Sequence, residues 1–542
     1  MNKLLKIINN YLLYRRNTVV YDQPIIEENV NIGYDSRKKD KEEKYTVSKS
    51  IDENYRIIAD KFNVPLNNDV VIRWFMIKGD IKCFIIYYEG MSDTAVIDDY
   101  IIRGLMELPY IQDKRIKKPE ELLSESFIIH TQLKMTDSID SLTDEVNFGC
   151  CGLFIDGFDC CFHMDVKKWE HRTVTKPENE QSVYGPQEAF NEMVRTDTIL
   201  IRKILKTEKL IAEGIKIGNI SKTSGVLLYI EGITNKTLVD NVRRRLIAID
   251  TDFIFSTEEV SQLIEDSSYS LVSQTVSSER PDRVARALAD GRVAYLMNGS
   301  PRALIFPSTF YELTHAASDS YIKAPYANMT RIIRYVGMLV SVLFPALYLA
   351  ITLFHQEMLP TYLLYAISAA RVNVPFPSVL ELLLMDLSFE LIREAGLRMP
   401  GAVGQTLGIV GGLILGQSAV SAKIVSPIMI VVIAITGIGS FSTSDYSLSW
   451  SFRILRIIFI LLAASSGFFG IALGIFVLGC YIASLSNFGV PYLSPFPGSG
   501  NNAFFGSVFV KSIWKRNKRP EFLAPQKSKS EAFISRGWFT KK

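Results

Sequence analysis

Hydrophobic and polar residues are distributed unevenly along this chain of 542 residues. Up to Thr330 charged residues are frequent and apolar residues form short runs. Beyond Tyr335 charges become rare, and residues 457–510 contain no Asp, Glu, Lys or Arg. A helix that crosses the hydrocarbon core of a bilayer needs about 20 apolar residues. The pattern therefore predicts a polar N-terminal part joined to a membrane part.

The N-terminal part contains one sequence pattern twice. Glu89-Gly90 corresponds to Glu231-Gly232, and Asp156-Gly157 corresponds to Asn298-Gly299, at an offset of 142 positions in both cases. Separate segments that share one offset are unexpected unless the whole region is repeated. The pattern therefore indicates two copies of one α/β unit.

Within each copy an apolar run, residues 83–88 or 226–230, predicts a buried strand. A glycine ends each run, and Ser92 or Thr234 follows as the predicted N-cap of the next helix. Asp-Gly and Asn-Gly tolerate positive φ, so residues 152–166 and 293–306 are predicted hairpins. A helix that opens at Pro281 is expected to end at Gly291.

The membrane part contains several apolar stretches long enough to span a bilayer. Four spans are predicted: 335–354, 399–422, 424–444 and 457–485. Two further candidates are 359–370 and 377–397. The last of the four spans is longer than one crossing needs, and Ser465-Ser466-Gly467 predicts a break within it.

The expected fold is a pair of tandem cytoplasmic α/β domains followed by an all-α, multi-span membrane domain. The expected boundaries are 1–48 for a charged N-terminal extension, 49–190 and 191–330 for the two α/β copies, 331–495 for the membrane domain and 496–542 for a basic tail.

One membrane stretch, residues 380–398, places its charges on a single helical face. Asp386, Glu390, Arg393 and Glu394 follow the spacing i, i+4, i+7, i+8. Ionisable side chains are costly in hydrocarbon, so this face must meet water, protein or lipid headgroups. It is a candidate lining of an ion path in an oligomer. A helix that lies flat on the bilayer surface is the other interpretation.

Small residues mark the following span. They are Gly408, Gly411, Gly412 and Gly416, with the polar Gln417 beside them. Glycines at this spacing allow helices to approach closely, so we expect helix packing there. A gating role is the alternative.

The basic tail carries ten Lys or Arg residues between positions 511 and 542, against Glu521 and Glu531. Positive charge next to an apolar run favours the cytoplasmic side, and contact with anionic membrane lipid is compatible with it. The start of the chain lacks the long apolar core of a secretion signal. We therefore expect both the α/β domains and the tail in the cytoplasm. The net charge of +3 gives no reason to expect nucleic acid as a partner.

The sequence offers no support for catalysis. Phosphate-binding, dinucleotide-binding and nucleophile-elbow motifs are missing from it. Cys150-Cys151 and Cys160-Cys161 lie near His163, but adjacent strand residues point to opposite faces. We interpret these cysteines as apolar strand residues rather than metal ligands. No enzyme activity, metal or cofactor is expected.

Taken together, the motifs resemble those of the A subunits of GerA-type spore germinant receptors. In the N-terminal part the matching segments are 185–190, 195–198, 229–233, 278–282, Gly291-Arg292 and 298–301. In the membrane part they are 374–377, 393–396 with Arg398 and Pro400, 408–412 with Gly416-Gln417, and 488–495. The resemblance covers roughly residues 50–500.

This resemblance implies a subunit of a nutrient receptor in the inner membrane of an endospore. Its partners would be a transporter-like B subunit and a lipoprotein C subunit, and the A subunit would form an oligomeric, ligand-gated ion channel. Two alternatives remain. One is a paralogue that amplifies ion release without answering a nutrient, and the other is a secondary transporter.

Overall fold

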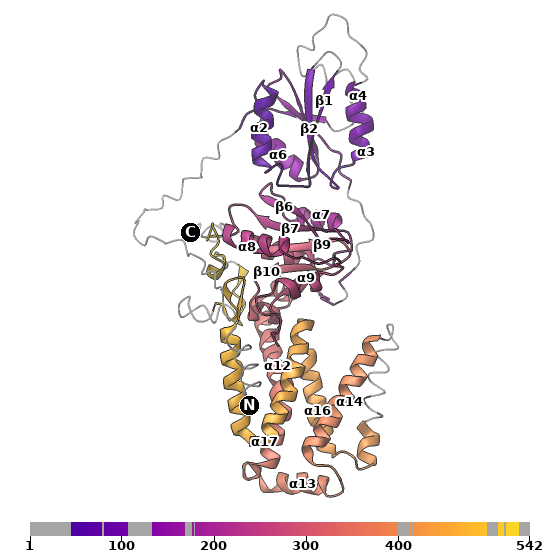
Figure 1. Ribbon diagram of the computed structural model, residues 1–542, viewed down its shortest axis with the longest axis vertical. Helices are drawn as coiled ribbons and strands as arrows, with labels where there is room; N and C mark the ends of the chain where they lie inside the picture. Colours follow the sequence, from indigo (N-terminus) through magenta and orange to yellow (C-terminus); the bar gives the residue numbers. More distant parts are fainter. Residues whose placement is uncertain are drawn as a thin grey trace, which may run out of the picture.

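The computed structural model describes residues 45–77, 81–106, 133–168, 176–177, 179–398, 412, 414, 416–495, 508–513, 516 and 518–530. Most of the predicted N-terminal extension lies outside these residues. The molecule is elongated, with one α/β domain at one end, a second beside it and a helical bundle at the other end (Figure 1).

The first domain, residues 45–168, is an antiparallel sheet between two helical layers. Its strands are β1 (Val70–Ile77), β2 (Ile81–Tyr88), β3 (Leu133–Thr136), β4 (Cys151–Ile155) and β5 (Cys161–Met164), in the order β1-β2-β4-β5-β3. Its helices are α2 (Ile51–Lys61), α3 (Thr94–Val96), η1 (Ile97–Ile102), α4 (Arg103–Met106) and α6 (Ile139–Asn147). Side chains of β2 alternate between two cores, with Phe84 facing α2 and α6, and Ile85 facing η1 and α4.

The second domain, residues 179–322, has a sheet with the same strand order. Its strands are β6 (Leu210–Ile217), β7 (Thr223–Ile230), β8 (Val276–Ser278), β9 (Val293–Met297) and β10 (Ala303–Phe306), in the order β6-β7-β9-β10-β8. Helices α7 (Val194–Ile204) and α10 (Pro281–Ala289) share one core with the sheet, and α8 (Lys236–Ile247) and α9 (Thr257–Ile264) share the other. The short α11 (Phe310–Thr314) follows β10.

Most local predictions for these domains are confirmed. Strands β9 and β10 have the predicted bounds, and the hairpin glycines Gly157 and Gly299 have φ values of 88° and 87°. The predicted N-caps, however, are wrong by one residue. Asp93 caps α3 and Asn235 caps α8, each accepting backbone N–H groups of the first turn.

Ser92 and Thr234 use their hydroxyl groups elsewhere. Ser92 Oγ donates to the carbonyl of Gly149 at 3.0 Å, and Thr234 Oγ1 accepts from the N–H of Ile230 at 3.2 Å. Thr234 therefore closes the turn after β7, whereas Ser92 ties the end of β2 to the segment after α6, and in both domains the next residue caps the helix.

The bundle consists of α12 (Ala324–Leu353), α13 (Thr361–Arg371), α14 (Ser378–Arg398), α16 (Pro427–Phe441) and α17 (Tyr446–Ser484). Among the described residues, α12 and α17 are long and apolar enough to cross a membrane, whereas the apolar α16 has 15 residues. The predicted span 399–422 lies largely outside the described residues. Figure 1 shows α13 at the end of the bundle farthest from the α/β domains.

Helix α17 contains the predicted break, and the break is a reversal of direction. Gly467 has φ 60° and ψ −136°, so 446–466 and 468–484 form two separate arms. The tip lies against Phe354 and His355, just beyond the end of α12, while Leu448 and Leu485 both enter a core of the second domain. Both ends of α17 therefore lie at the end of the bundle nearest the second domain.

Helices α14 and α16 are parallel to each other and antiparallel to α12. At the far end, the backbone N–H of Ser426 donates to Glu381 at 3.0 Å. Near the second domain, Arg393 donates to Ser440, and Gly439 packs against Gly337 of α12.

Candidate functional site

The charged face of α14 is turned into the bundle, where it meets two arginines of α17. We call Asp386, Glu390, Arg393, Arg453 and Arg456 the charge cluster. Periodicity alone placed the first three on one face. The turns of α17 before Gly467 bring the other two to the same level.

Arg456 is the centre of the charge cluster. Its Nη2 lies 2.8 Å from Asp386 Oδ1 and 2.9 Å from Glu390 Oε1, and its Nε donates to Asp386 Oδ2 at 3.3 Å. The side chains of Arg456 and Asp386 are only 1% and 6% exposed. A guanidinium group can bind two carboxylates at once because its donors form a planar fork. Burial of either charge alone would cost several kcal/mol, so each requires the other.

Two further arginines surround Glu390. Arg453 Nη1 lies 3.4 Å from Glu390 Oε2, and Arg393 Nη1 lies 3.6 Å from Glu390 Oε1. Arg453 also stacks on Trp450, with 4.5 Å between the guanidinium carbon and the ring centroid, and Arg393 stacks on Phe441 at 4.7 Å. These aromatic faces stabilise the cations where water is scarce.

The charge cluster lies at the depth of the bilayer centre if the bundle spans the membrane. Arg456 is ten residues beyond Tyr446, about 15 Å along a helix. Asp386 is eight residues beyond Ser378, about 12 Å from the opposite end. A hydrocarbon core is about 30 Å thick, so in a bundle that crosses it both side chains would lie near its middle.

The outward face of α14 is apolar. Leu387 and Leu391 are 59% and 62% exposed, and Leu380 and Leu384 lie on the same side of the helix. An exposed leucine face with charges inside is the reverse of the pattern in water-soluble proteins. It is the pattern expected for a helix that contacts lipid or a neighbouring subunit.

The remaining candidate residues are placed less centrally. Glu394 is half-buried near the end of α14. Gly416 is buried, and a Cβ placed there would be in ordinary van der Waals contact with Ile430 of α16, whereas a Cβ at Gly412 would meet open space and Gln417 is exposed. Gly408 and Gly411 lie outside the described residues.

Sequence reasoning missed the role of Arg453 and Arg456. The signal was present, because two arginines three residues apart interrupt an otherwise apolar helix. Like Asp386 and Glu390 on α14, they are one helical turn apart and so lie on one face of their helix. The sequence alone did not indicate that α17 supplies the positive charges for α14, because Arg456 and Asp386 are 70 positions apart.

A second buried carboxylate lies at the far end of the bundle. Glu381 is fully buried, with Arg371 Nε 3.8 Å away and the Ser426 N–H bound to it. Ser426 is also the N-cap of α16. Because this pair fixes the start of α14 against the start of α16, we interpret it as structural.

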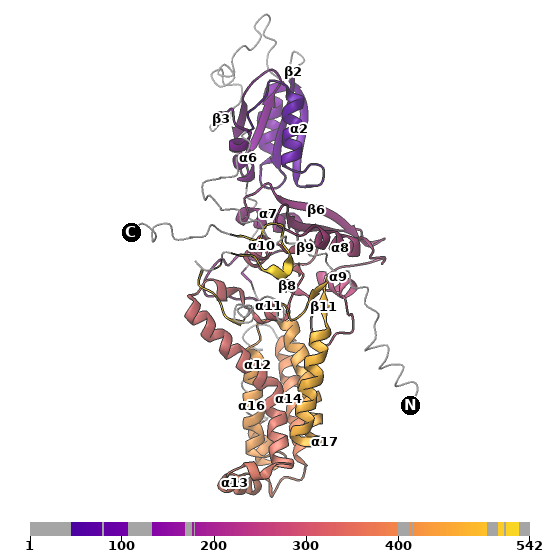
Figure 2. The ribbon, with the colours of Figure 1, turned by 90° about the vertical axis from the view of Figure 1, so that its left-hand side faces the viewer.

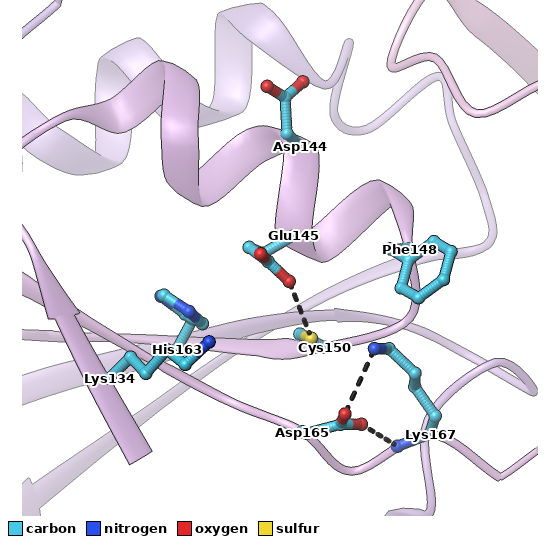
Figure 3. A pocket seen from close by; sticks show the side chains of 8 residues that line it. All are labelled: Lys134, Asp144, Glu145, Phe148, Cys150, His163, Asp165 and Lys167. Atoms are coloured by element: carbon cyan, nitrogen blue, oxygen red, sulfur yellow. Dashed lines mark hydrogen bonds and ion pairs between the residues drawn. The ribbon is translucent and has the colours of Figure 1, made fainter. Parts of the chain in front are cut away.

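The first domain contains a polar cavity of about 420 Å³, drawn in Figure 3. Its lining residues are Lys134, Asp144, Glu145, Phe148, Cys150, His163, Asp165 and Lys167. Lys167 pairs with Asp165 at 3.1 Å, and Cys150 Sγ donates to Glu145 at 3.4 Å.

The side chains that line this cavity show no sign of an activated catalytic group. Burial raises the pKa of the Cys150 thiol to about 12, so it is not a thiolate at neutral pH. Burial lowers the pKa of His163. Throughout the described residues, no three His, Cys, Asp or Glu side chains gather in a way that could hold a metal ion. The cavity therefore lacks an activated nucleophile.

Known proteins resemble this chain over most of its length. The profile described as "Bacillus/Clostridium GerA spore germination protein" matches residues 56–522. Spore germination protein KA of Bacillus subtilis (strain 168) is 35% identical over 493 residues, which cover 90% of this chain and 89% of that protein.

Two more relatives have similar coverage. Spore germination protein A1 of Bacillus subtilis (strain 168) is 34% identical over 86% of this chain and 95% of its own length. Spore germination protein GerLA of Bacillus cereus is 35% identical over 81% of this chain and 88% of its own length. A crystal structure of the N-terminal domain of the A subunit of the Bacillus megaterium spore germinant receptor GerK3 covers 49% of this chain and 98% of that domain. Its identity is 30% and its TM-score 0.39.

Proposed function

This chain belongs to the GerA family of spore germination proteins, and on that premise we propose that it is the A subunit of a nutrient germinant receptor that forms an oligomeric, ligand-gated ion channel. The receptor lies in the inner membrane of the endospore. Nutrient binding opens the channel, ions leave, and germination begins. The other receptor components are a transporter-like B subunit and a lipoprotein C subunit.

The observation that carries this proposal is the charge cluster at mid-bundle. Ionisable groups at this depth are costly and mark ion or proton pathways in membrane proteins. Two carboxylates and three guanidinium groups converge there from α14 and α17. A bundle that needed only to anchor the α/β domains would gain nothing from these residues.

The pairing within the charge cluster represents a non-conducting arrangement. Arg456 occupies both Asp386 and Glu390, so neither carboxylate is available to a passing ion. Separation of α14 from α17 would expose them to an aqueous path. The apolar outer face of α14, with Leu387 and Leu391, contacts lipid or the neighbouring subunit of the oligomer.

The proposed topology places both α/β domains and the C-terminal segment in the cytoplasm. Helix α12 leaves the second domain, and both arms of α17 end beside that domain. This arrangement supports a position on the same side of the membrane for the two α/β domains and the C-terminal segment. We also propose that the two domains are copies of one unit. Their identical strand orders and the common offset of 142 positions between β5 and β10 support this.

The observation that favoured a secondary transporter was a predicted break within the last apolar span. A helix broken near the bilayer centre would have favoured it. The break at Gly467 lies instead at the tip of α17, against Phe354 and His355, and is a turn between two helices.

Ion flux through liposomes tests the channel. The chain, co-purified with its B and C partners, is compared with Glu390→Gln and Glu394→Gln. Nutrient should trigger flux in the wild type. Loss of the Glu390 charge should change conductance or ion selectivity several-fold, because Arg453 and Arg456 lose a countercharge. Glu357→Gln is the matched control, since Glu357 is an exposed carboxylate at the far end of the bundle.

Three outcomes would count against parts of the proposal. Flux that is equal in all variants would leave the channel but remove the charge cluster from its path. Flux that ignores every nutrient would favour the amplifying paralogue. An intact complex that never conducts would overturn the channel and leave a signal-coupling subunit.

A further inference from the structure

The C-terminal segment 518–530 is packed against the second domain, whose residues precede it by more than 200 positions in the sequence. Figure 2 shows it in yellow over the second domain, near α10 and β9. Arg519 is nearly buried and donates from Nε to the carbonyl of Ala289 at 2.7 Å. Leu523, in the short helix η5 (Glu521–Leu523), is 3% exposed.

Three hydrogen bonds hold the stretch 524–526 at the end of strand β7. The N–H of Gln526 donates to the carbonyl of Ile233 at 2.9 Å, and its Nε2 donates to the carbonyl of Thr234 at 2.9 Å. Asn235 Nδ2 donates to the carbonyl of Ala524 at 3.3 Å. We call the surface formed by 233–235 and 289–291 the strand-end groove.

The first domain has a corresponding groove, which its own chain fills. The N–H of Lys168 donates to the carbonyl of Met91 at 3.1 Å, and the N–H of Asp93 donates to the carbonyl of Val166 at 2.7 Å. Met91 and Asp93 lie 142 positions before Ile233 and Asn235. Residues 166–168 in the first domain thus occupy the place that 524–526 occupy in the second.

The glycines beneath the two segments match as well. Gly149 has φ 99°, and a Cβ there would lie 3.3 Å from both Lys167 Cγ and the Met91 carbonyl oxygen. Gly291, 142 positions later, has φ 98°, and a Cβ there would lie 3.4 Å from Pro525 Cβ and 3.6 Å from the Ile233 carbonyl oxygen. Lys167 and Pro525 are therefore equivalent in position.

The second domain cannot fill this groove in the same way. After β10 its chain turns away, and Ser308, the counterpart of Val166, donates from Oγ to the carbonyl of Gln274. The next residues begin α11, and the N–H of Phe310 donates to the carbonyl of Tyr492. The strand-end groove would be left empty without a segment from elsewhere.

We propose that the second domain is completed by 518–530, which acts as an intramolecular ligand of the strand-end groove and replaces the segment that the first domain supplies from its own sheet. The segment binds by backbone hydrogen bonds, by the buried Leu523 and by Arg519. It ties the chain beyond the last helical arm back onto the domain that carries α12. Because no covalent link holds it in the groove, it is removable.

A peptide-binding measurement tests this proposal. The chain truncated after Ile513, in detergent, is titrated with a fluorescent peptide of residues 516–530. We expect saturable binding that unlabelled peptide reverses, and at least tenfold weaker binding to the full chain, whose groove is occupied. A peptide with Arg519→Ala should bind at least about tenfold more weakly, since it loses the charged hydrogen bond to the Ala289 carbonyl. Lys518→Ala is the control, because the Lys518 side chain is 72% exposed.

A substitution in the groove tests the other side of the contact. Asn235→Asp replaces the amide oxygen that caps α8 with a carboxylate oxygen, which caps equally well, but removes the Nδ2 donor to Ala524, so peptide affinity should fall while the helix remains. Equal binding by the full and truncated chains would overturn the proposal, as would an Arg519→Ala peptide with unchanged affinity.

Hydrogen exchange in the full chain covers the case in which the truncated chain does not fold. Arg519→Ala should speed exchange of the Gln526 amide, which donates to the Ile233 carbonyl, and leave the Lys168 amide, which donates to the Met91 carbonyl of the first domain, unchanged. Unchanged exchange at both sites would contradict the proposal.

Discussion

Asp197 shows how a single residue can make the second domain sensitive to pH. It lies on α7, is completely buried, and accepts the N–H of Asn191 at 2.8 Å. Among the described residues no donor reaches its Oδ2. Burial raises the pKa of this carboxyl to about 8, whereas an aspartate in an unfolded chain titrates near 4. The folded protein therefore holds a proton at Asp197 that the unfolded chain releases at neutral pH.

We predict that the second domain loses stability as pH rises from about 4 to 8. The folded pKa is raised, so the stabilisation is complete below the unfolded pKa and disappears as pH passes the folded pKa. The slope is at most about 1.4 kcal/mol per pH unit for one proton. Asp197→Asn should flatten this dependence, which thermal unfolding of the intact chain at several pH values would measure. The exposed Asp252→Asn should leave it unchanged, and an unchanged slope in Asp197→Asn would exclude this carboxyl as the cause.

At the level of elements, local signals were readable and long-range pairings were not. Val293–Met297 and Ala303–Phe306 were predictable as strands because apolar runs and an Asn-Gly turn define them over 14 residues. The break at Ser465-Ser466-Gly467 was predictable as well. Its conversion into a full turn is accompanied by contacts with Phe354 and His355, which lie just beyond the end of α12 and more than 100 positions away in the sequence.

Gly467→Val should destabilise the α17 turn. The backbone there, at φ 60° and ψ −136°, is one that residues with a Cβ rarely adopt, and the new Cβ would lie 2.9 Å from His355 Cε1. We expect a loss of about 1–3 kcal/mol, seen as a lower unfolding temperature in detergent. Gly479→Ala in the second arm has open space around it and should be neutral or slightly stabilising. Equal effects of the two changes would show that the turn geometry is not limiting.

At the level of the whole molecule, the domains form a chain of contacts that ends at the bundle. Arg202 of α7 reaches into the first domain, where its Nη2 lies 2.8 Å from Asp69 Oδ1 and its guanidinium group stacks on Tyr88 at 4.2 Å. On the other side of the second domain, Tyr481 of α17 donates to Ser270 at 3.1 Å. These contacts join the first domain to the second, and the second domain to α17.

Asp69→Ala should uncouple the two α/β domains. It leaves the guanidinium group of Arg202 buried with its countercharge removed, which typically costs about 3–5 kcal/mol. We expect faster hydrogen exchange in 63–69 and in α7, with the sheets of both domains unaffected. Arg73→Ala removes a pair whose side chains are half exposed and should change little. If both variants exchange alike, the Asp69–Arg202 contact does not hold the domains together.

The strand-end groove can be filled only near the end of synthesis of the chain. Gln526 meets Thr234 across 292 positions of the chain, and every helix of the bundle is made between them. A ribosome that adds about 5–20 residues per second needs about 15–60 s for this stretch. During that time the second domain is already made, its groove is uncovered, and the bundle is still being synthesised. An unfinished chain therefore exposes the strand-end groove, which a finished chain covers with residues 518–530.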